Sequence, residues 1–356
     1  MKMTWRWFGE GNDSVSLAQI RQVPGVGGIV WSLHDKVAGE VWEEARIQAE
    51  VERIQAQGFH AEVVESVNIH DSIKIGSSDR DRHIDVYIDT LEKLARHGVK
   101  VICYNFMPVF DWVRTDLYHP LPDGSNALFY QKAKAERDPR EVIQEILEGA
   151  GTFTMPGWEP ERLARIEELF QAYAGVDEAG LTANLRYFLE AIIPVCERCG
   201  VKMAVHPDDP PWPLYGLPRI VRSREHIRRY LAQVDSPCNG LTLCTGSLGA
   251  DPANDIPALI REFGPRIHFA HIRNLRHLAN GDFVETSHRT ADGSLDIRGI
   301  VEAFHQVGFT GYVRPDHGRH LWGEEKTCRP GYGLHDRALG VMYLWGLWDA
   351  FQGGGK

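Results

Sequence analysis

The sequence contains no apolar run long enough to cross a membrane. Its 356 residues are 43% hydrophobic and include ten tryptophans, so a large core can be buried. No run approaches the roughly 20 apolar residues that a transmembrane helix needs. The opening residues MKMTWRWFGEGND lack the apolar segment and the small-residue cleavage site of a secretory signal. We therefore expect a globular, soluble protein of the cytoplasm with no membrane partner.

Positive charge is scarce relative to negative charge. Lysine and arginine number 39 against 49 aspartates and glutamates, which gives a formal net charge of -10, and the basic residues are dispersed along the chain. A chain of this charge repels nucleic acid and anionic membranes. The composition therefore argues against a nucleic-acid partner and favours a small-molecule substrate.

Cysteines are few, and nothing in the sequence suggests secretion. The six thiols are therefore expected to be reduced. Cys196 and Cys199 form a Cys-x-x-Cys, but they lie in the apolar-periodic segment LRYFLEAIIPVCERCG, where residues three apart share a helix face. Cys103 falls within a predicted strand. We interpret these three as packing residues rather than as a redox or zinc site.

A dinucleotide-binding fingerprint is also missing, because no GxGxxG follows the first apolar run. The sequence instead contains eight short apolar runs, most of them separated by a turn and a longer amphipathic stretch, which is typical of parallel βα units. The runs are residues 3–8, 28–33, 61–66, 99–106, 201–207, 240–244, 266–273 and 312–317. Eight such units favour a closed (β/α)8 TIM barrel over an open doubly wound sheet.

Helical stretches between these runs end at glycine, the usual helix stop, as in residues 40–58, 83–98 and 296–308. The length is compatible with two average domains, but barrels with insertions of this length routinely form one domain. We predict a single barrel domain over residues 1–356.

Residues 110–178 interrupt the rhythm, since they separate the fourth strand from its helix by more than an ordinary loop. Within them, 138–149 and 159–173 have helical patterns with early prolines, while LYHPLPDGSN is rich in turn residues. We predict a helical insertion. It would act as a lid or a subunit contact, or else be a surface decoration without a catalytic part.

Four consecutive strands end in residues that commonly bind metals: His206, Cys244, His271 and Asp316. In a (β/α)8 barrel the active site forms at the carboxyl ends of the strands. A single strand-end histidine is often only a hydrogen-bonded polar residue, and a single buried cysteine often only packs in the core. Such explanations would have to hold at all four strand ends at once. Imidazole and carboxylate suit iron, manganese or zinc, and a thiolate adds a strong, soft donor. The sequence therefore predicts one divalent metal ion on these residues.

Other candidates surround this group. Arg273 shares a strand face with His271 and would either clamp a substrate carboxylate or form a structural ion pair. His317 follows Asp316 and would act as an acid or base. Tyr332 lies in a glycine-flanked loop, where it would either pack or relay a proton, and Asp209 is the predicted partner of a substrate hydroxyl.

Longer segments extend the pattern. The opening MTWRWFG with IRQVPGVGGIV, the central HPDDPPWPLYGLPRI and LTLCTGSLGA, and the later RPDHGRHLWGE with PGYGLHDRALG cover nearly the whole chain. In these motifs the sequence resembles the mannonate dehydratase family. The resemblance implies a xylose-isomerase-like barrel that requires Mn2+ or Fe2+ and converts D-mannonate to 2-dehydro-3-deoxy-D-gluconate in glucuronate breakdown. It also implies His206, Cys244, His271 and Asp316 as metal ligands, and His317 with Tyr332 as the acid/base pair.

Dehydration of a 2,3-dihydroxy acid fits these residues, because loss of the C2 proton and of the C3 hydroxyl both build negative charge that a metal neutralises. The sequence does not assign the base and the acid. A metal-dependent sugar isomerase or epimerase is the alternative, although such enzymes often use more carboxylate ligands. A metal-dependent binding or regulatory protein is a third possibility, but a structural metal site would lack His317 beside its ligand Asp316. We expect a homo-oligomer, with a dimer favoured.

Overall fold

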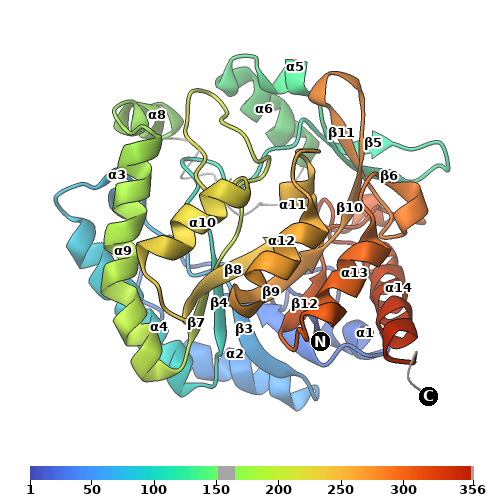
Figure 1. Ribbon diagram of the computed structural model, residues 1–356, viewed down its shortest axis with the longest axis horizontal. Helices are drawn as coiled ribbons and strands as arrows, with labels where there is room; N and C mark the ends of the chain where they lie inside the picture. Colours follow the sequence, from blue (N-terminus) through green and yellow to red (C-terminus); the bar gives the residue numbers. More distant parts are fainter. Residues whose placement is uncertain (151–164, 354–356) are drawn as a thin grey trace.

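The computed structural model describes residues 1–150 and 165–353. Eight parallel strands close into a barrel around which helices are arranged (Figure 1). Around the barrel the strands follow in the order β1 (Lys2–Arg6), β12 (Tyr312–Pro315), β9 (Ile267–Ile272), β8 (Asn239–Cys244), β7 (Lys202–Val205), β4 (Val101–Tyr104), β3 (His60–Glu65) and β2 (Gly28–Trp31). The predicted (β/α)8 barrel is confirmed.

An outer ring of helices connects the strands. Its members are α1 (Leu17–Arg21), α2 (Glu44–Ala56), α4 (Arg80–Arg96), α9 (Glu178–Cys199), α10 (Arg224–Gln233), α12 (Ile256–Phe263), α13 (Ile297–Gln306) and α14 (His335–Gln352). Side chains of Ser16, Asp177 and Ser223 accept hydrogen bonds from the first turns of α1, α9 and α10, which satisfies otherwise unpaired backbone donors. After α2 and α4, Gly58 and Gly98 have φ of 79° and 87°, the left-handed conformation that ends helices.

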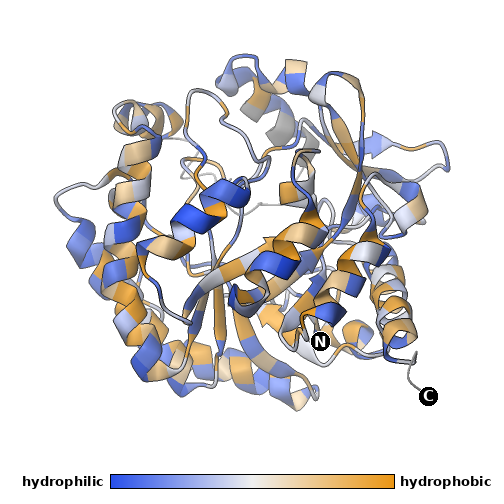
Figure 2. Ribbon diagram, viewed as in Figure 1, coloured by the Kyte–Doolittle hydropathy of each residue, from blue (hydrophilic) through white to orange (hydrophobic). Residues whose placement is uncertain are grey.

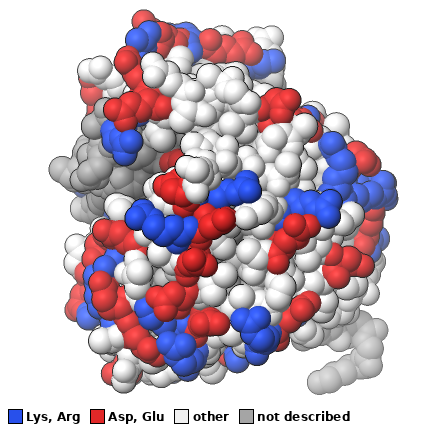
Figure 3. Space-filling view, turned by 90° about the vertical axis from the view of Figure 1, so that its left-hand side faces the viewer, with Lys and Arg blue, Asp and Glu red and all other residues white. Residues whose placement is uncertain are grey.

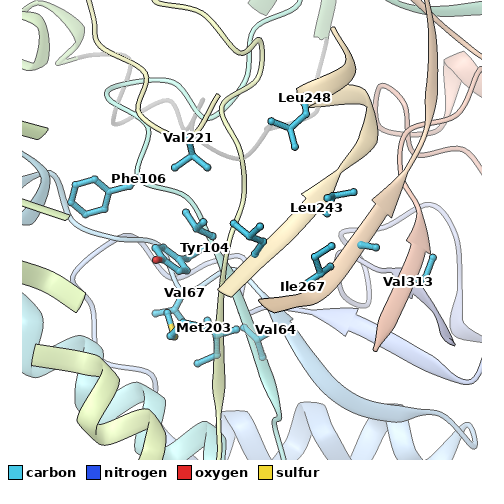
Figure 4. Packing of buried hydrophobic residues seen from close by; sticks show 14 of the residues in the cluster. Val64, Val67, Tyr104, Phe106, Met203, Val221, Leu243, Leu248, Ile267 and Val313 are labelled. Carbon is cyan, nitrogen blue, oxygen red and sulfur yellow. The ribbon is translucent and has the colours of Figure 1, made fainter. Parts of the chain in front are cut away.

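Strand alternation divides the core into two regions. Residues of one parity fill the barrel interior: Val30, Val63, Val101, Cys103, Ala204, Phe269 and Tyr312. Residues of the other parity, such as Val64, Met203 and Leu243, pack outward against the helices (Figure 4). The strands are accordingly hydrophobic, whereas the helices of the ring carry hydrophilic residues as well (Figure 2). Successive side chains of a strand point to opposite faces, so the interior parity also fixes which residues face inward at the strand ends.

The predicted helical insertion contains helices, but it also contains two strands that the sequence analysis did not predict. Residues 110–178 contain a hairpin, β5 (Asp116–Pro120) and β6 (Asn126–Tyr130), besides α5 (Lys132–Ala135), α6 (Pro139–Ala150) and α8 (Ile166–Tyr173). The turn-rich segment around Gly124, which has φ of 85°, is the hairpin loop.

Strand β6 pairs with a second hairpin that follows β9, made of β10 (Asn274–His277) and β11 (Phe283–Thr286), so that a four-stranded antiparallel sheet forms in the order β10-β11-β6-β5. The predicted helix 138–149 is confirmed as α6. Of the predicted helix 159–173, residues Ile166–Tyr173 form α8, and residues 159–164 lie outside the described part of the chain.

Within the described residues, no helix combines the length and apolarity needed to cross a membrane. Lys and Arg are interspersed with Asp and Glu on the face shown in Figure 3. All six cysteines are unpaired. Cys196 and Cys199 lie in α9, as their helical spacing predicts.

Candidate metal centre and active site

Strand parity brings the predicted metal ligands into the barrel mouth. Ala204 and Phe269 face the interior, so His206 and His271, two residues further along, face the same way. Tyr312 also faces the interior, and Asp316, four residues further along, has the same parity and therefore faces inward as well. Cys244 and His271 are paired neighbours on β8 and β9. Local alternation thus turns four separate strand ends into one cluster.

The cluster is compact enough to hold one metal ion. Ligand atoms of His206, Cys244 and His271 all lie within 4.8 Å of one another, and Asp316 Oδ2 is 3.5 Å from Cys244 Sγ. His206 Nδ1 lies 2.7 Å from the Pro207 carbonyl oxygen, to which it donates. That bond leaves Nε2 as the coordinating nitrogen, the usual arrangement of a metal-binding histidine.

The donor set fits a divalent cation. His271 is fully buried, and its Nε2 makes no well-aligned hydrogen bond among the described residues, the nearest carboxylate being that of Glu65 at 3.4 Å. A metal ion would satisfy this buried nitrogen. Burial lowers the pKa of His206 below its ordinary value. Burial, with Arg314 nearby, lowers the pKa of His271 to about 4. Both imidazoles are therefore neutral near pH 7, as metal coordination requires.

The other two predicted ligands differ in charge. Burial alone would raise the pKa of Asp316, but the neighbouring Arg314, His317 and Arg273 hold it well below its usual range, so this carboxylate is ionised. Burial raises the pKa of the Cys244 thiol to about 12. In the metal-free protein the thiol therefore keeps its proton and donates to Asp316.

A further carboxylate, not expected from the sequence, belongs to this region. Glu65 at the end of β3 lies 3.4 Å from His271 Nε2 and forms a second compact group with Cys103 and His271. Its two oxygens accept hydrogen bonds from Arg314 at 3.1 and 3.2 Å. The strand-end rule that selected the four ligands could also have selected Glu65, because it lies two residues beyond the interior-facing Val63.

Arg273 and Asp209, the predicted substrate-binding residues, lie in a buried network of four charges. Arg273 Nη2 is 2.5 Å from Asp209 Oδ2, and Arg273 Nη1 is 2.9 Å from Glu285 Oε1. Arg114 lies 2.8 Å from both of these carboxylates. Each of the four residues is at most 3% exposed. The arrangement favours the structural ion pair over the carboxylate clamp, since these groups already have partners.

Gly246 makes the position of Arg273 possible. A Cβ atom on Gly246 would lie 1.9 Å from Arg273 Nε and 2.4 Å from its Cγ. Both distances are impossible, so only glycine allows the arginine to pack across the start of α11 (Thr245–Gly249).

His317 and Tyr332 lie together beside the metal cluster, with ring centroids 5.0 Å apart. His317 Nδ1 is 3.0 Å from Glu285 Oε2, and Trp112 packs 5.7 Å from the imidazole ring. Glu285 is the acceptor that orients the ring when Nδ1 carries the proton, which leaves Nε2 for proton exchange. Burial raises the pKa of Tyr332 to about 12, so its phenol is protonated at neutral pH.

The insertion contributes directly to this site. Trp112 and Arg114, from its first residues, contact His317 and the four-charge network. Asp111 and Leu169 also line a cavity of about 230 Å3 that is bounded by residues following β3 and β4. These residues are therefore more than surface decoration. No sequence motif pointed to Arg114 or Glu285, which lie 171 positions apart.

A closed (β/α)8 barrel whose strand ends gather a buried His-Cys-His-Asp group beside a histidine and a tyrosine defines a barrel enzyme with a candidate metal centre. The profile of the D-mannonate dehydratase (UxuA) family matches residues 1–356. Mannonate dehydratase 1 of Halalkalibacterium halodurans is 62% identical over 355 residues, which cover 99% of this chain and 98% of that protein. The mannonate dehydratase of Bacillus subtilis is 59% identical over 353 residues, with coverage of 99% and 98%. The chain therefore belongs to the D-mannonate dehydratase family, a family of hydro-lyases.

Solved structures agree with this assignment. The crystal structure of mannonate dehydratase from Streptococcus suis serotype 2 superimposes with a TM-score of 0.88 at 40% identity, covering 100% of this chain and 96% of that chain. A D-psicose 3-epimerase structure superimposes with a TM-score of 0.55 at 13% identity, covering 99% and 100%. At that identity the likeness extends to the barrel fold alone, so it does not support the isomerase or epimerase alternative.

Proposed function

We propose that this protein dehydrates D-mannonate to 2-dehydro-3-deoxy-D-gluconate with the aid of Mn2+ or Fe2+. The observation that carries the proposal is the compact cluster of His206, Cys244 and His271 beside the His317–Tyr332 pair, in a chain of this family. Asp316 would complete the ligand set. When bound, the ion would supply positive charge that stabilises the negative charge built up during the elimination.

The roles of the proton carriers follow from their surroundings. Tyr332 is protonated at neutral pH because burial raises its pKa to about 12, which suits a donor to the departing C3 hydroxyl. His317 Nδ1 lies 3.0 Å from Glu285 Oε2 and 2.7 Å from Arg273 Nη1. In the tautomer in which Nδ1 donates to Glu285, Nε2 is unprotonated and serves as the base that removes the C2 proton. Glu285 is a positioning residue, because it acts through the imidazole and is itself held by Arg273 and Arg114.

Arg273 and Asp209 were predicted to bind substrate. Their contacts favour a structural role instead. Asp209 and Glu285 neutralise the buried guanidinium groups of Arg273 and Arg114, and Glu285 holds His317 in place. A charge-conserving Arg273→Lys variant separates the roles. A structural role predicts a lower catalytic constant with little change in KM, because lysine cannot bridge two carboxylates in a fork.

A solvent-exchange experiment tests the proposed reaction and its assignment of base and acid. Purified enzyme with Mn2+ should convert D-mannonate to a 2-keto-3-deoxy acid, and the activity should fall when the metal is chelated. In D2O, Tyr332→Phe should still exchange the C2 proton of D-mannonate for deuterium while forming little product, whereas His317→Asn should lose both reactions. Exchange in His317→Asn but not in Tyr332→Phe would reverse the two roles, and absence of any product with D-mannonate would refute the proposed function.

Two further features belong to the proposal. A cytoplasmic location is supported by the six unpaired thiols, which are typical of a reducing compartment. Assembly into a homodimer is supported by Leu339 and Met342 of α14, whose apolar side chains are 52% and 48% exposed. Light scattering should give the mass of two chains, and replacing both residues with lysine should shift it toward one chain.

A further inference from the structure

A buried arginine at the end of β1 forms no salt bridge with any residue that the structure describes. Arg6 is 4% exposed, its Nη1 makes no hydrogen bond to a described residue, and its acidic neighbour Glu65 is not within salt-bridge distance of its guanidinium. A buried cation in this state is costly unless a partner compensates it. A polar side chain that the protein itself leaves unpaired suggests a ligand of opposite charge.

Arg6 lies in the same layer as the metal cluster. Met3 of β1 pairs with Val313 of β12, and continuing this parallel register by three residues places Arg6 beside Asp316. Glu65 is an acidic neighbour of Arg6, but its two oxygens already accept hydrogen bonds from Arg314. Arg6 therefore adds a positive charge to the layer, and no carboxylate in residues 1–150 or 165–353 binds it directly.

A second unpaired group lies next to Arg6. Both Arg6 and His34 contact the Phe8 ring. The Arg6 guanidinium carbon lies 4.8 Å from the centroid of that ring, and the His34 ring centroid lies 5.1 Å from it. His34 Nε2 is buried and makes no hydrogen bond to the described residues. Burial, together with Arg6 and Arg329, lowers the pKa of His34 well below its ordinary value, so this imidazole is neutral and can accept a hydrogen bond.

The same ring connects these groups with the proposed acid. Tyr332 packs edge-on against Phe8 with centroids 4.8 Å apart, and His317 lies 5.0 Å beyond Tyr332. Arg6, His34 and Tyr332 thus surround one aromatic side chain that is itself 2% exposed. The two unpaired groups are therefore within a short distance of the residues proposed to carry out the chemistry.

Two neighbouring arginines differ from Arg6 in that their guanidinium groups donate hydrogen bonds. Arg329 donates to Asn12 Oδ1 at 2.5 Å. Arg337 donates to the backbone carbonyls of Gly333, Arg6 and Tyr332 at 2.7, 3.0 and 2.7 Å. These bonds tie the loop that carries Tyr332 to the N-terminal segment, whereas the Arg6 guanidinium packs over the Phe8 ring and makes no side-chain hydrogen bond within the described part of the chain.

We propose that Arg6 binds the carboxylate of the substrate and that His34 accepts a hydrogen bond from a substrate hydroxyl beside it. This assignment rests on the proposed function only in taking an aldonate as the ligand. It replaces Arg273 as the carboxylate-binding residue, because Arg273 is bound to Asp209 and Glu285. A planar guanidinium suits this role, since its donors match the two oxygens of a carboxylate.

The test compares two ligands that differ only in the carboxylate. D-Mannitol has the carbon chain of D-mannonate with a hydroxymethyl group in place of the acid. Binding of each is measured by calorimetry on chelator-treated protein, in which dehydration does not obscure the equilibrium, and KM and the catalytic constant are measured on the Mn2+-loaded enzyme. The variants are Arg6→Met and Arg6→Lys, with Arg21→Met as an exposed arginine control from the following helix.

Arg6→Met should weaken D-mannonate binding by about 10- to 100-fold, the contribution of a charge-assisted hydrogen-bonded pair, and leave D-mannitol unchanged. Its KM should rise more than its catalytic constant falls. His34→Phe should instead weaken both ligands by a similar factor, about 2- to 10-fold. Arg21→Met should match the wild type in every measurement.

The proposal is overturned if folded Arg6→Met keeps the wild-type preference for D-mannonate over D-mannitol. Should Arg6→Met fail to fold, Arg6→Lys decides the question, because a lysine keeps the charge but loses the bidentate fork. Unaltered D-mannonate affinity in Arg6→Lys would then overturn the proposal. Failure of the proposed function appears separately, as a wild-type enzyme that forms no keto acid from D-mannonate.

Discussion

Binding of the metal ion should release about one proton, and that proton should come from Cys244. Of the four predicted ligands, His206 and His271 are neutral near pH 7 because burial lowers their pKa values, and Asp316 is already ionised. Only the Cys244 thiol, whose pKa burial raises to about 12, must lose a proton before it coordinates.

The size of the effect follows from that pKa. At pH 7 the thiol is about five pH units below its pKa, so ionisation costs about 7 kcal/mol at 1.36 kcal/mol per unit. The metal must supply this free energy. Below the pKa of the thiol, each increase of one pH unit lowers the free energy of ionising Cys244 by about 1.36 kcal/mol. The affinity for Mn2+ should therefore increase about tenfold between pH 7 and pH 8. The sign is fixed, because the proton competes with the metal for the sulfur.

Titration calorimetry with Mn2+ in two buffers of different ionisation enthalpy counts the released protons. We expect about one for the wild type and for Cys196→Ser, which removes a thiol of α9 far along the sequence from the site. Cys244→Ser should bind Mn2+ more weakly, without proton release and without the pH dependence. Release of no proton or of two, or an unchanged pH dependence in Cys244→Ser, would refute the reasoning.

The remaining predictions concern single side chains. His317→Asn and Tyr332→Phe should each lower the catalytic constant by about 10²–10⁴ while elemental analysis finds unchanged metal content; a normal rate in either variant removes that residue from the mechanism. Asp316→Asn should lose Mn2+ on dialysis yet keep its circular dichroism spectrum, and full metal retention would exclude Asp316 as a ligand. Gly246→Ala should lower the free energy of unfolding by about 1–3 kcal/mol in urea, because the new methyl group collides with the guanidinium that packs on it. Gly346→Ala, at a position of α14 with nothing within 4 Å of the new Cβ, is the control and should be neutral or stabilising; equal effects would contradict the packing argument.

Local sequence pattern was sufficient for the barrel and for the candidate ligand set. Side chains alternate strictly along a strand, and parallel strands of a barrel end on the same side. A strand-end residue of the inward parity therefore faces the mouth whatever its partners are. This is why His206, Cys244, His271 and Asp316 could be grouped from the sequence, and the same rule applied to Arg6 and Glu65 would have added them.

Only the tertiary structure decided which groups are paired. Arg273 has the parity of a substrate-binding residue, but its partner Glu285 lies in β11, and Arg114 reaches the same carboxylate from the insertion. The hairpin β5–β6 was missed for the same reason, since its outer neighbour β11 follows more than 150 residues later in the chain. Periodicity records which way a side chain points relative to its own strand. Whether a buried charge is satisfied depends on contacts between segments far apart in sequence, for which a single chain carries no local signal, and this left Arg273 occupied and Arg6 unpaired.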